Sequence, residues 1–281
     1  SFTSPCFTDT GLFCKWMEFE MERITSKDNE KIKWLIKLQN SRKVRQESAS
    51  FVAEGMRLAQ EVLRCGLPLQ QVFASDDGAA RYASVWNALC QKASAAYLIS
   101  DGLEAKISSV QTPQGIYCVC GMPRHTFGQI AGFGEKFLAL DHLQDPGNLG
   151  TIIRTADSFG ADGILLSEGC ADCYSPKVLR STMGSVFRLP IWTVPDLAQT
   201  LKELHQAGFS TFGAALDETA ICLGNFSFSQ KSVAVVGNEG NGISRPVLDA
   251  CQQTLYIPMK GETESLNAGV AASLILWEMC R

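Results

Sequence analysis

The chain has 281 residues, 46% of them hydrophobic and 19% charged, with a formal net charge of −4 at pH 7. It is long enough for two domains, and its composition is that of a globular protein. No segment approaches the roughly 20 apolar residues that span a bilayer, and no basic region precedes an apolar run at the amino terminus. We therefore expect a soluble, cytoplasmic protein with no membrane partner.

Eleven cysteines are scattered through apolar segments of this chain. In a chain of this length the pattern indicates buried free thiols rather than a disulfide framework. Cys170 and Cys173 form a CxxC pair, but the second pair or spaced histidine of a zinc site is missing. We expect no metal.

The amino-terminal segments contribute no catalytic pattern. Residues 1–22 resemble no element of a fold, and we interpret them as vector sequence or a misplaced start codon. Residues 23–46 hold eight Lys or Arg against Asp28 and Glu30 and form a predicted basic arm. The charge run fits a solvated helix face as well as phosphate binding. Under the second interpretation the contacts would come from Lys27, Lys33, Lys37, Arg42, Lys43 and Arg45.

Residues 47–123 alternate between strand and helix patterns. The strands are predicted at FVAE, LQQVFAS, AAYLIS and GIYCVCGM. The helices are predicted at GMRLAQEVLRCG, AARYASVWNALCQK and Leu103–Val110. This order predicts a small α/β domain, and the glycine-rich residues 124–133 after it are typical of a linker.

Residues 134–281 repeat the alternation on a larger scale. The strands are predicted at FLALDHL, GILLS, STFGAAL, VAVVG and TLYIPM, and the stretch 170–195 is less regular. The helices are predicted at NLGTIIRTADSFG, DLAQTLKELHQAG and from about Leu266 to Cys280. Continuous apolar strands between helices indicate a parallel sheet covered on both faces, with ligands beyond the carboxyl ends of its strands.

The first segment with chemical potential is DHLQDPGNLGTIIR. Pro146 and Gly147 turn the chain, Asn148 is predicted to cap a helix, and Arg154 lies within its first two turns. An ordinary capped turn with an exposed arginine remains an alternative.

The second segment is VVGNEGNGIS. Its glycines at 237, 240 and 242 read GxxGxG, the reverse of a dinucleotide fingerprint, and no P-loop Lys-Ser or Lys-Thr follows. The glycines still let a ligand lie against bare backbone. Ser244 is predicted to cap the next helix. A glycine turn that serves packing alone remains an alternative.

The third segment is IPMKGETESLNAGVAASL. A polar loop with Ser265 and Asn267 opens a helix whose early residues, such as Ala268 and Gly269, are small and allow close packing. A buried carboxyl-terminal helix with a serine cap would explain the helix but not the polar cluster.

In this order, DPGNLGTIIRTADSFGADGILL, VVGNEGNGIS and IPMKGETESLNAGVAASL closely resemble the three signature motifs of the SpoU (TrmH) branch of the SPOUT RNA methyltransferases. The resemblance covers about residues 134–281. The module headed by FVAEGMRLAQEVL is similar to the ribosomal-protein-like substrate-binding domain that many members carry.

The resemblance implies an α/β domain with a deep trefoil knot, S-adenosylmethionine as cofactor, and methylation of a ribose 2′-hydroxyl in structured RNA. It implies a homodimer, and the extra domain favours ribosomal RNA over tRNA. It assigns catalysis to Arg154, Asn148, Glu239, Ser265 and Asn267. It assigns cofactor binding to Gly237, Ile257, Leu266, Ala214, Ala215, Leu216, Asn238, Met259 and Asn267.

Two points stay open. A guanidinium has a pKa above about 12, so we expect Arg154 to position a phosphate and stabilise a developing alkoxide rather than act as a literal base. A tRNA methyltransferase, or a non-catalytic RNA-binding or assembly protein of the same fold, is the alternative function.

Overall fold

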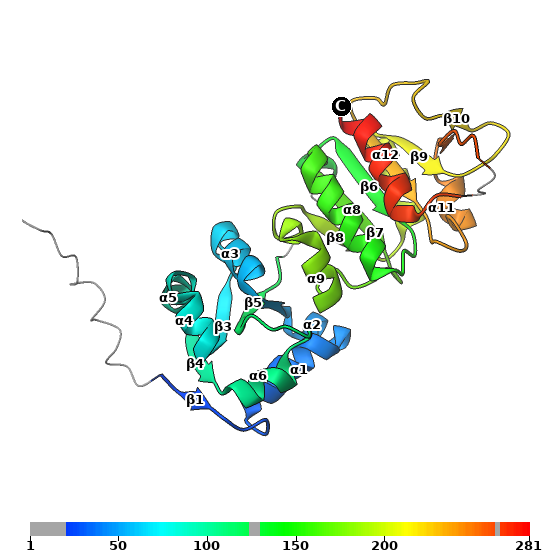
Figure 1. Ribbon diagram of the computed structural model, residues 1–281. Helices are drawn as coiled ribbons and strands as arrows, with labels where there is room; N and C mark the ends of the chain where they lie inside the picture. The colour runs from blue at the N-terminus through cyan, green and yellow to red at the C-terminus, as the bar shows by residue number, and fades with distance from the viewer. Residues whose placement is uncertain (1–20, 124–129, 262–264) are drawn as a thin grey trace, which may run out of the picture.

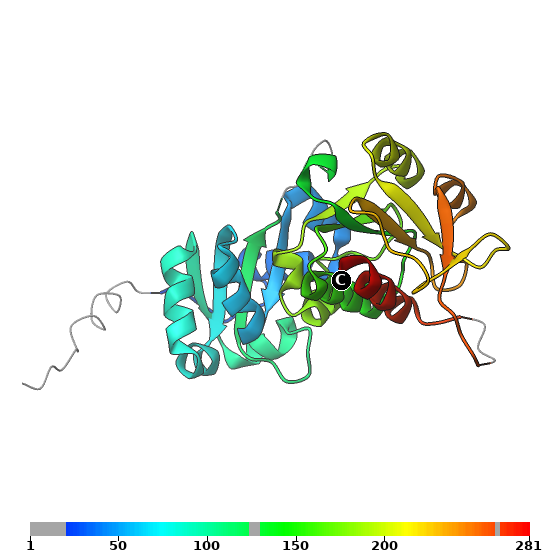
Figure 2. The same ribbon diagram turned by 90° about the horizontal axis from the view of Figure 1, so that it is seen from above.

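The computed structural model describes residues 21–123, 130–261 and 265–281 (Figure 1). It consists of two α/β domains side by side, each built on its own sheet (Figure 2). Residues 1–20 of the segment interpreted as vector sequence, and residues 124–129 of the predicted linker, lie outside the described residues.

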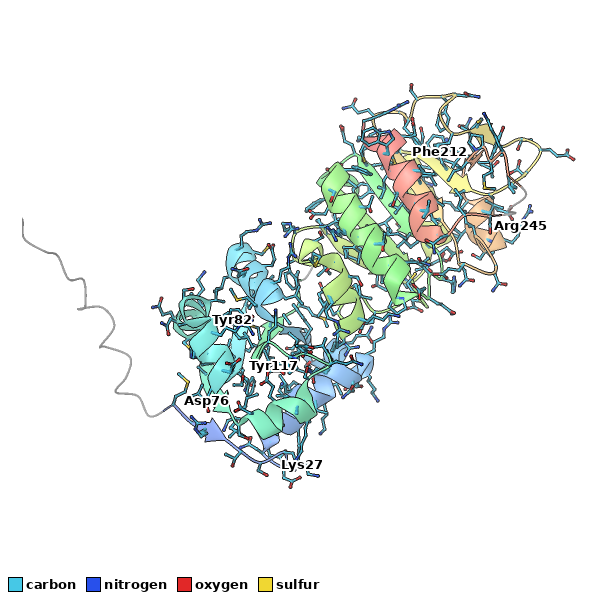
Figure 3. The ribbon with its side chains drawn as sticks, in the orientation of Figure 1. Lys27, Asp76, Tyr82, Tyr117, Phe212 and Arg245 are labelled. Carbon is cyan, nitrogen blue, oxygen red and sulfur yellow. The ribbon has the colours of Figure 1, made fainter. Side chains whose placement is uncertain are left out.

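The amino-terminal domain is a five-stranded sheet in the order β1-β4-β3-β5-β2, in which β5 runs antiparallel to β2 and β3. The strands are β1 Arg23–Ile24, β2 Ser50–Glu54, β3 Leu69–Ser75, β4 Ala95–Ile99 and β5 Ile116–Gly121. The helices are α1 Glu30–Asn40, α2 Arg42–Ser48, α3 Met56–Cys65, α4 Asp76–Arg81, α5 Ala83–Lys92 and α6 Asp101–Ile107. Tyr117 of β5 lies inside this domain, whereas Lys27 lies at its outer edge (Figure 3).

The segment expected as a basic arm is folded into this domain. β1 pairs with β4, and α1 buries Ile32, Leu35 and Leu38 at 0% exposure. These side chains recur every three residues and so lie on one side of the helix, which packs on the sheet. The charged residues that suggested an arm lie mainly on the opposite side.

The carboxyl-terminal domain is a seven-stranded parallel sheet in the order β10-β12-β9-β11-β6-β7-β8, as the apolar runs predict. The strands are β6 Lys136–Leu140, β7 Gly163–Ser167, β8 Ile191–Val194, β9 Ser210–Ala214, β10 Ile221–Cys222, β11 Ser232–Val236 and β12 Gln253–Tyr256. The helices are α7 Ile130–Phe133, α8 Pro146–Phe159, α9 Pro176–Thr182, α10 Leu197–Gln206, α11 Arg245–Asp249 and α12 Ala268–Cys280.

Helices cover both faces of this sheet. α8 lies between α9 and α12 on one face (Figure 1), and α10 and α11 lie together on the other. The stretch expected to be irregular contains α9, a 3₁₀ turn at Ser185–Phe187 and β8. The trefoil knot stays a prediction.

The two domains share one apolar core. A single cluster of buried side chains runs from β2 and α3 of the first domain to α8 and α9 of the second. The ring of Phe51 lies 4.9 Å from Tyr174 and 5.6 Å from Phe187. Arg188 also bridges Glu61 on α3 and Asp157 on α8. The domains are therefore packed together as one body.

Arg45 adds an ion pair within this interface. Its guanidinium lies 2.6 Å from Asp172; the Arg45 side chain is buried, with 5% exposed, and that of Asp172 is largely buried, with 14% exposed. The same guanidinium donates to the carbonyl oxygens of Leu38 and Gln39. Arg45 therefore ties α1 and α2 to the loop that precedes α9.

We expect Arg45→Ala to lower the free energy of unfolding by roughly 3 kcal/mol, because it leaves the largely buried Asp172 carboxylate without its cation. Urea denaturation measures the change. Lys43→Ala, at an exposed position on the same helix, should change the midpoint little. Equal midpoints for the two variants would contradict a structural role for Arg45.

Candidate active site

Polar side chains from the three motif segments meet at the carboxyl edge of the large sheet. Glu239, which follows β11, accepts a hydrogen bond from Asn148 Nδ2 on α8 at 3.0 Å. Asn148 Oδ1 in turn accepts one from Asn267 Nδ2 at 2.9 Å. One continuous network thus joins motifs that are 91 and 119 residues apart in the chain.

Glu239 is the anionic end of this network. Partial burial raises the pKa of its carboxyl, but the hydrogen bonds from Asn148 and from the backbone N–H groups of Asp145 and Gln144 outweigh this and lower it below the ordinary value. Glu239 is therefore ionised at neutral pH. Its charge holds the loop that opens α8.

The network also orders the starts of two helices. Asp145, not Asn148 as expected, caps α8 by accepting from the Asn148 backbone N–H at 2.7 Å, with Pro146 in the first turn. This leaves the Asn148 side chain free to bridge Glu239 and Asn267. Asn267 caps α12 by accepting from the N–H groups of Gly269 and Val270.

The glycine segment after β11 closes on itself. The N–H and C=O groups of Asn238 and Gly242 bond reciprocally at 2.9 and 3.0 Å. The Asn238 side chain accepts from the N–H groups of Gly240 and Asn241 and donates to the carbonyl of His142. A Cβ on Gly237 would lie 2.1 Å from the carbonyl carbon of Gly242. This tight turn therefore requires glycine at 237.

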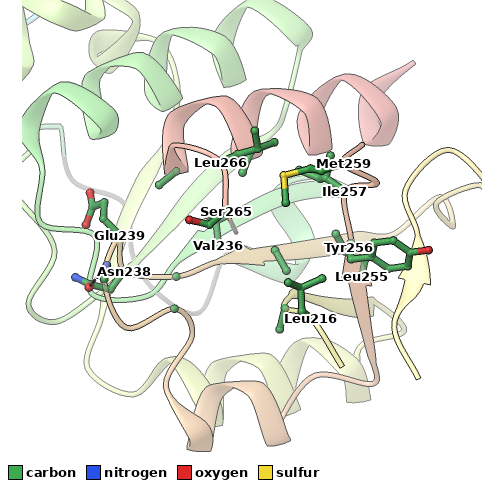
Figure 4. Close-up of a pocket in the computed structure, with 17 residues that line it drawn as sticks. Leu216, Val236, Asn238, Glu239, Leu255, Tyr256, Ile257, Met259, Ser265 and Leu266 are labelled. Atoms are coloured by element: carbon green, nitrogen blue, oxygen red, sulfur yellow. Dashed lines mark hydrogen bonds between the residues drawn. The ribbon is translucent and has the colours of Figure 1, made fainter. Parts of the chain in front are cut away.

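A pocket of about 310 Å³ opens beside this turn, at the ends of β9, β11 and β12 (Figure 4). Large apolar side chains at its edge remain accessible, with Leu216 72%, Met259 37% and Leu266 36% exposed. Of the residues assigned to cofactor binding, those that line it are Ala214, Ala215, Leu216, Gly237, Asn238, Ile257, Met259 and Leu266.

The remaining assigned residues divide between the pocket and its surroundings. Glu239 and Ser265 line it, whereas Asn148 and Asn267 are outside the lining and reach it through the hydrogen-bond network. Residues that the sequence analysis missed also line it: Val236, Gly240, Gly242, Leu255, Tyr256, Ala268 and Ala271. Most of these flank assigned residues, so widening each motif to the adjacent strand end and first helical turn would have found them.

Arg154 belongs neither to the lining of the pocket nor to the Glu239–Asn148–Asn267 network. It is exposed on α8, and its guanidinium has no ion pair or hydrogen bond with any residue that the structure describes. Six residues separate it from Asn148, which places it roughly 120° around the helix. This turns it away from α12 and toward α9. Arg154 is therefore available to a partner from outside the chain.

The basic residues predicted to bind RNA have different surroundings. Lys27, Lys37 and Lys43 are exposed, and Lys33 pairs with Glu30. Arg42 donates to the carbonyl of Cys170 at 2.8 Å. The prediction for Arg45 is wrong, because this side chain is 4% exposed and already paired with Asp172.

The parts of the chain that the structure describes offer neither a membrane span nor a metal site. No helix there is long and apolar enough to cross a membrane. No group of His, Cys, Asp or Glu side chains there is arranged to hold a metal ion.

Comparison with known proteins agrees with this geometry. A family model described as the SpoU rRNA methylase family matches residues 135–277, and one described as the MRM3-like substrate binding domain matches residues 29–118. The second range takes in α1 and α2.

Relatives match over nearly the whole chain. The 23S rRNA (guanosine(2553)-2′-O)-methyltransferase RlmP of Bacillus subtilis (strain 168) is 34% identical over 259 residues, which cover 92% of this chain and 99% of that protein. The AdoMet-bound rRNA methyltransferase from Sinorhizobium meliloti superposes with a TM-score of 0.81 at 28% identity, over 92% of this chain and 97% of that one.

A second solved structure, the SpoU methyltransferase AviRb from Streptomyces viridochromogenes in complex with AdoMet, gives a TM-score of 0.77 at 29% identity, over 89% of this chain and 96% of that one. Fold and pocket thus define an α/β methyltransferase domain joined to a substrate-binding domain. The chain belongs to the SpoU rRNA methylase family.

Proposed function

We propose that this protein transfers a methyl group from S-adenosylmethionine to the 2′-hydroxyl of a ribose in ribosomal RNA, in the cytoplasm. The observation that carries the proposal is the pocket at the carboxyl edge of the sheet, with the Glu239–Asn148–Asn267 network beside it. Relatives named as 23S rRNA 2′-O-methyltransferases support ribosomal RNA as the substrate.

The pocket residues fit this cofactor. Leu216, Met259 and Leu266 offer exposed apolar surface on which a purine ring can pack. The backbone near Gly237 offers polar groups unobstructed by side chains. The cofactor supplies an electrophilic methyl group, and the protein supplies its binding site and the orientation of the ribose.

The polar residues act on the ribose side. The Glu239–Asn148–Asn267 network fixes the first turns of α8 and α12 beside the pocket, so the substrate meets a preorganised wall. Arg154 holds a phosphate of the RNA and stabilises the negative charge that develops on the 2′-oxygen as it loses its proton. This role requires no deprotonated arginine.

The test is transfer of labelled methyl from S-adenosylmethionine to total RNA from a strain that lacks this gene, followed by size separation and nuclease mapping. We expect label in large ribosomal RNA at one 2′-O-methyl nucleotide. Label in tRNA alone would refute ribosomal RNA as the substrate. No label in any RNA, with cofactor binding intact, would favour a non-catalytic role.

We also propose that the protein acts as a homodimer through α12. Val270, Leu274 and Trp277 form a stripe at spacings of four and three residues and are 49%, 39% and 52% exposed. The Trp277 ring lies 5.4 Å from that of Phe159 on α8, which extends the apolar surface. Ala271 of the same helix lines the pocket. A second copy on this stripe would therefore border the active site.

We expect Trp277→Glu to raise the dissociation constant of the dimer roughly 30-fold to 1,000-fold, the effect of a charge at the centre of an apolar interface. Sedimentation velocity over a range of concentrations measures it. Lys202→Glu, on the helix that covers the opposite face of the sheet, is the control. A wild-type protein that sediments as a monomer at micromolar concentration would refute this dimer.

A further inference from the structure

A second hollow lies where the two domains meet, separate from the cofactor pocket. Its volume is about 400 Å³. The end of β2, the start of α3 and the loop after α6 form its amino-terminal side, and α9 and the residue after it form its carboxyl-terminal side. It shares no lining residue with the cofactor pocket.

The lining combines an apolar surface with two cations. Leu58, Val110 and Met183 supply the apolar part. Arg57 and Arg180 supply two guanidinium groups, and neither is paired with a carboxylate in the described ranges 21–123, 130–261 and 265–281. Such a surface suits a flat apolar ring carried next to an anion.

Glu54 is the acidic group in this lining, and its carboxylate already accepts hydrogen bonds from within the chain. Its carboxylate accepts hydrogen bonds from the hydroxyl groups of Ser108 and Ser109 and from the Ser109 N–H. Arg180 Nη1 donates to the same Ser109 hydroxyl at 2.7 Å. Glu54 therefore holds the Ser108–Ser109 turn, and further donor groups of Arg180 and all those of Arg57 remain for a ligand.

The hollow connects to Arg154 across α9. A Cβ on Gly150 of α8 would lie 2.3 Å from the Cβ of Ser181 on α9, so the two helices touch there. Arg154 follows Gly150 by four residues and lies on the same side of α8. Ser181 adjoins Arg180, and Lys177 lies one turn before Ser181. The cations Arg154, Lys177 and Arg180 therefore follow one another from α8 across α9 to the hollow, and the axes of packed helices lie roughly 8–10 Å apart.

We propose that the hollow binds an unpaired nucleotide of the same RNA, close to the phosphate that Arg154 holds in the proposed function. The base lies against Leu58, Val110 and Met183, and Arg57 and Arg180 hold the adjoining phosphate. Proteins read structured RNA chiefly at such unstacked bases, which pack on apolar side chains or guanidinium planes. The proposal rests on the proposed function, since it needs RNA as the substrate.

The test uses the full chain with large ribosomal RNA from a strain that lacks the gene. Arg57→Gln/Arg180→Gln removes both cations, and Thr112→Trp fills the hollow at an exposed lining position without changing the charge. Arg81→Gln/Lys92→Gln removes two exposed cations of the amino-terminal domain that do not line the hollow, and it serves as the control. The readouts are KM and kcat for RNA, filter binding against salt, and calorimetric titration with S-adenosylmethionine.

We expect both hollow variants to raise KM for RNA roughly 10-fold, the effect of losing one stacked base or its phosphate contacts, with kcat nearly unchanged. The double glutamine variant should also reduce the slope of log K against log salt by about 1, because one to two phosphate contacts disappear. Cofactor affinity should not change. An unchanged KM in both variants, or an equal rise in the control, would overturn the proposal.

The two proposals fail differently. If the wild type binds S-adenosylmethionine but methylates no RNA, the proposed function fails, and filter binding of the same RNA still decides the hollow. If the wild type methylates RNA normally and both hollow variants have the same KM for RNA as the wild type, the proposal for the hollow is refuted and the proposed function stands.

Discussion

Replacing Arg154 by alanine is expected to lower methyl transfer by roughly 10²- to 10³-fold, the effect of removing one group that stabilises transition-state charge. Affinity for S-adenosylmethionine should stay within about twofold, because Arg154 does not line the pocket. Single-turnover transfer and calorimetric titration measure the two effects. A variant that loses cofactor binding in parallel would place Arg154 in the pocket and contradict the structure.

Arg154→Lys separates electrostatic stabilisation from proton abstraction. Lysine keeps the positive charge but loses the planar fork that binds phosphate at two points. We expect partial activity and a pH–rate profile of the same shape as the wild type. A new acidic limb whose pKa depends on residue 154 would show that this residue takes the proton and would refute the electrostatic role.

Replacing Gly237 by alanine is expected to weaken S-adenosylmethionine binding roughly 10- to 100-fold, equivalent to about 1.4–2.7 kcal/mol. The added Cβ would lie 2.1–2.3 Å from backbone atoms of Gly242 and Ile243, which cannot rotate aside as a side chain does. The turn must therefore open at the wall of the pocket. Calorimetric titration and thermal unfolding together measure the effect.

Gly240→Ala is the matched control within the same turn. Its added Cβ would meet only the Asn238 side-chain oxygen at 3.6 Å, an ordinary contact. We expect cofactor affinity within about threefold of the wild type. Equal losses of cofactor affinity in the two variants would show that the whole segment tolerates no added side chain. The effect at residue 237 would then not be due to a specific clash there.

Local patterns were sufficient to predict the sheet and the wall of the pocket. Strands such as VAVVG are apolar throughout, which places them inside a parallel sheet and so places the following loops at one edge. The family motifs then indicated which residues in those loops are candidates for cofactor binding. Gly237, Ile257 and Leu266 line the pocket as expected.

Contacts between distant segments could not be predicted in this way. Arg45 counts as one more positive charge in the sequence, and only the fold brings it to Asp172, 127 residues later. The cap of α8 is a second feature that local sequence could not predict. Asp145 and Asn148 are both good capping residues, and the choice of Asp145 depends on Glu239 and Asn267 holding the Asn148 side chain.

The core that runs without interruption from β2 to α8 fixes the distance between the two domains. A hinged pair of domains could accept RNA sites of many sizes, whereas this chain presents its amino-terminal surface and its pocket at a single separation. The protein can therefore select RNA by the distance between two of its parts. An RNA would qualify as a substrate when the recognised element and the acceptor ribose lie one such length apart, so that inserting a few nucleotides between them would abolish methylation without changing either element.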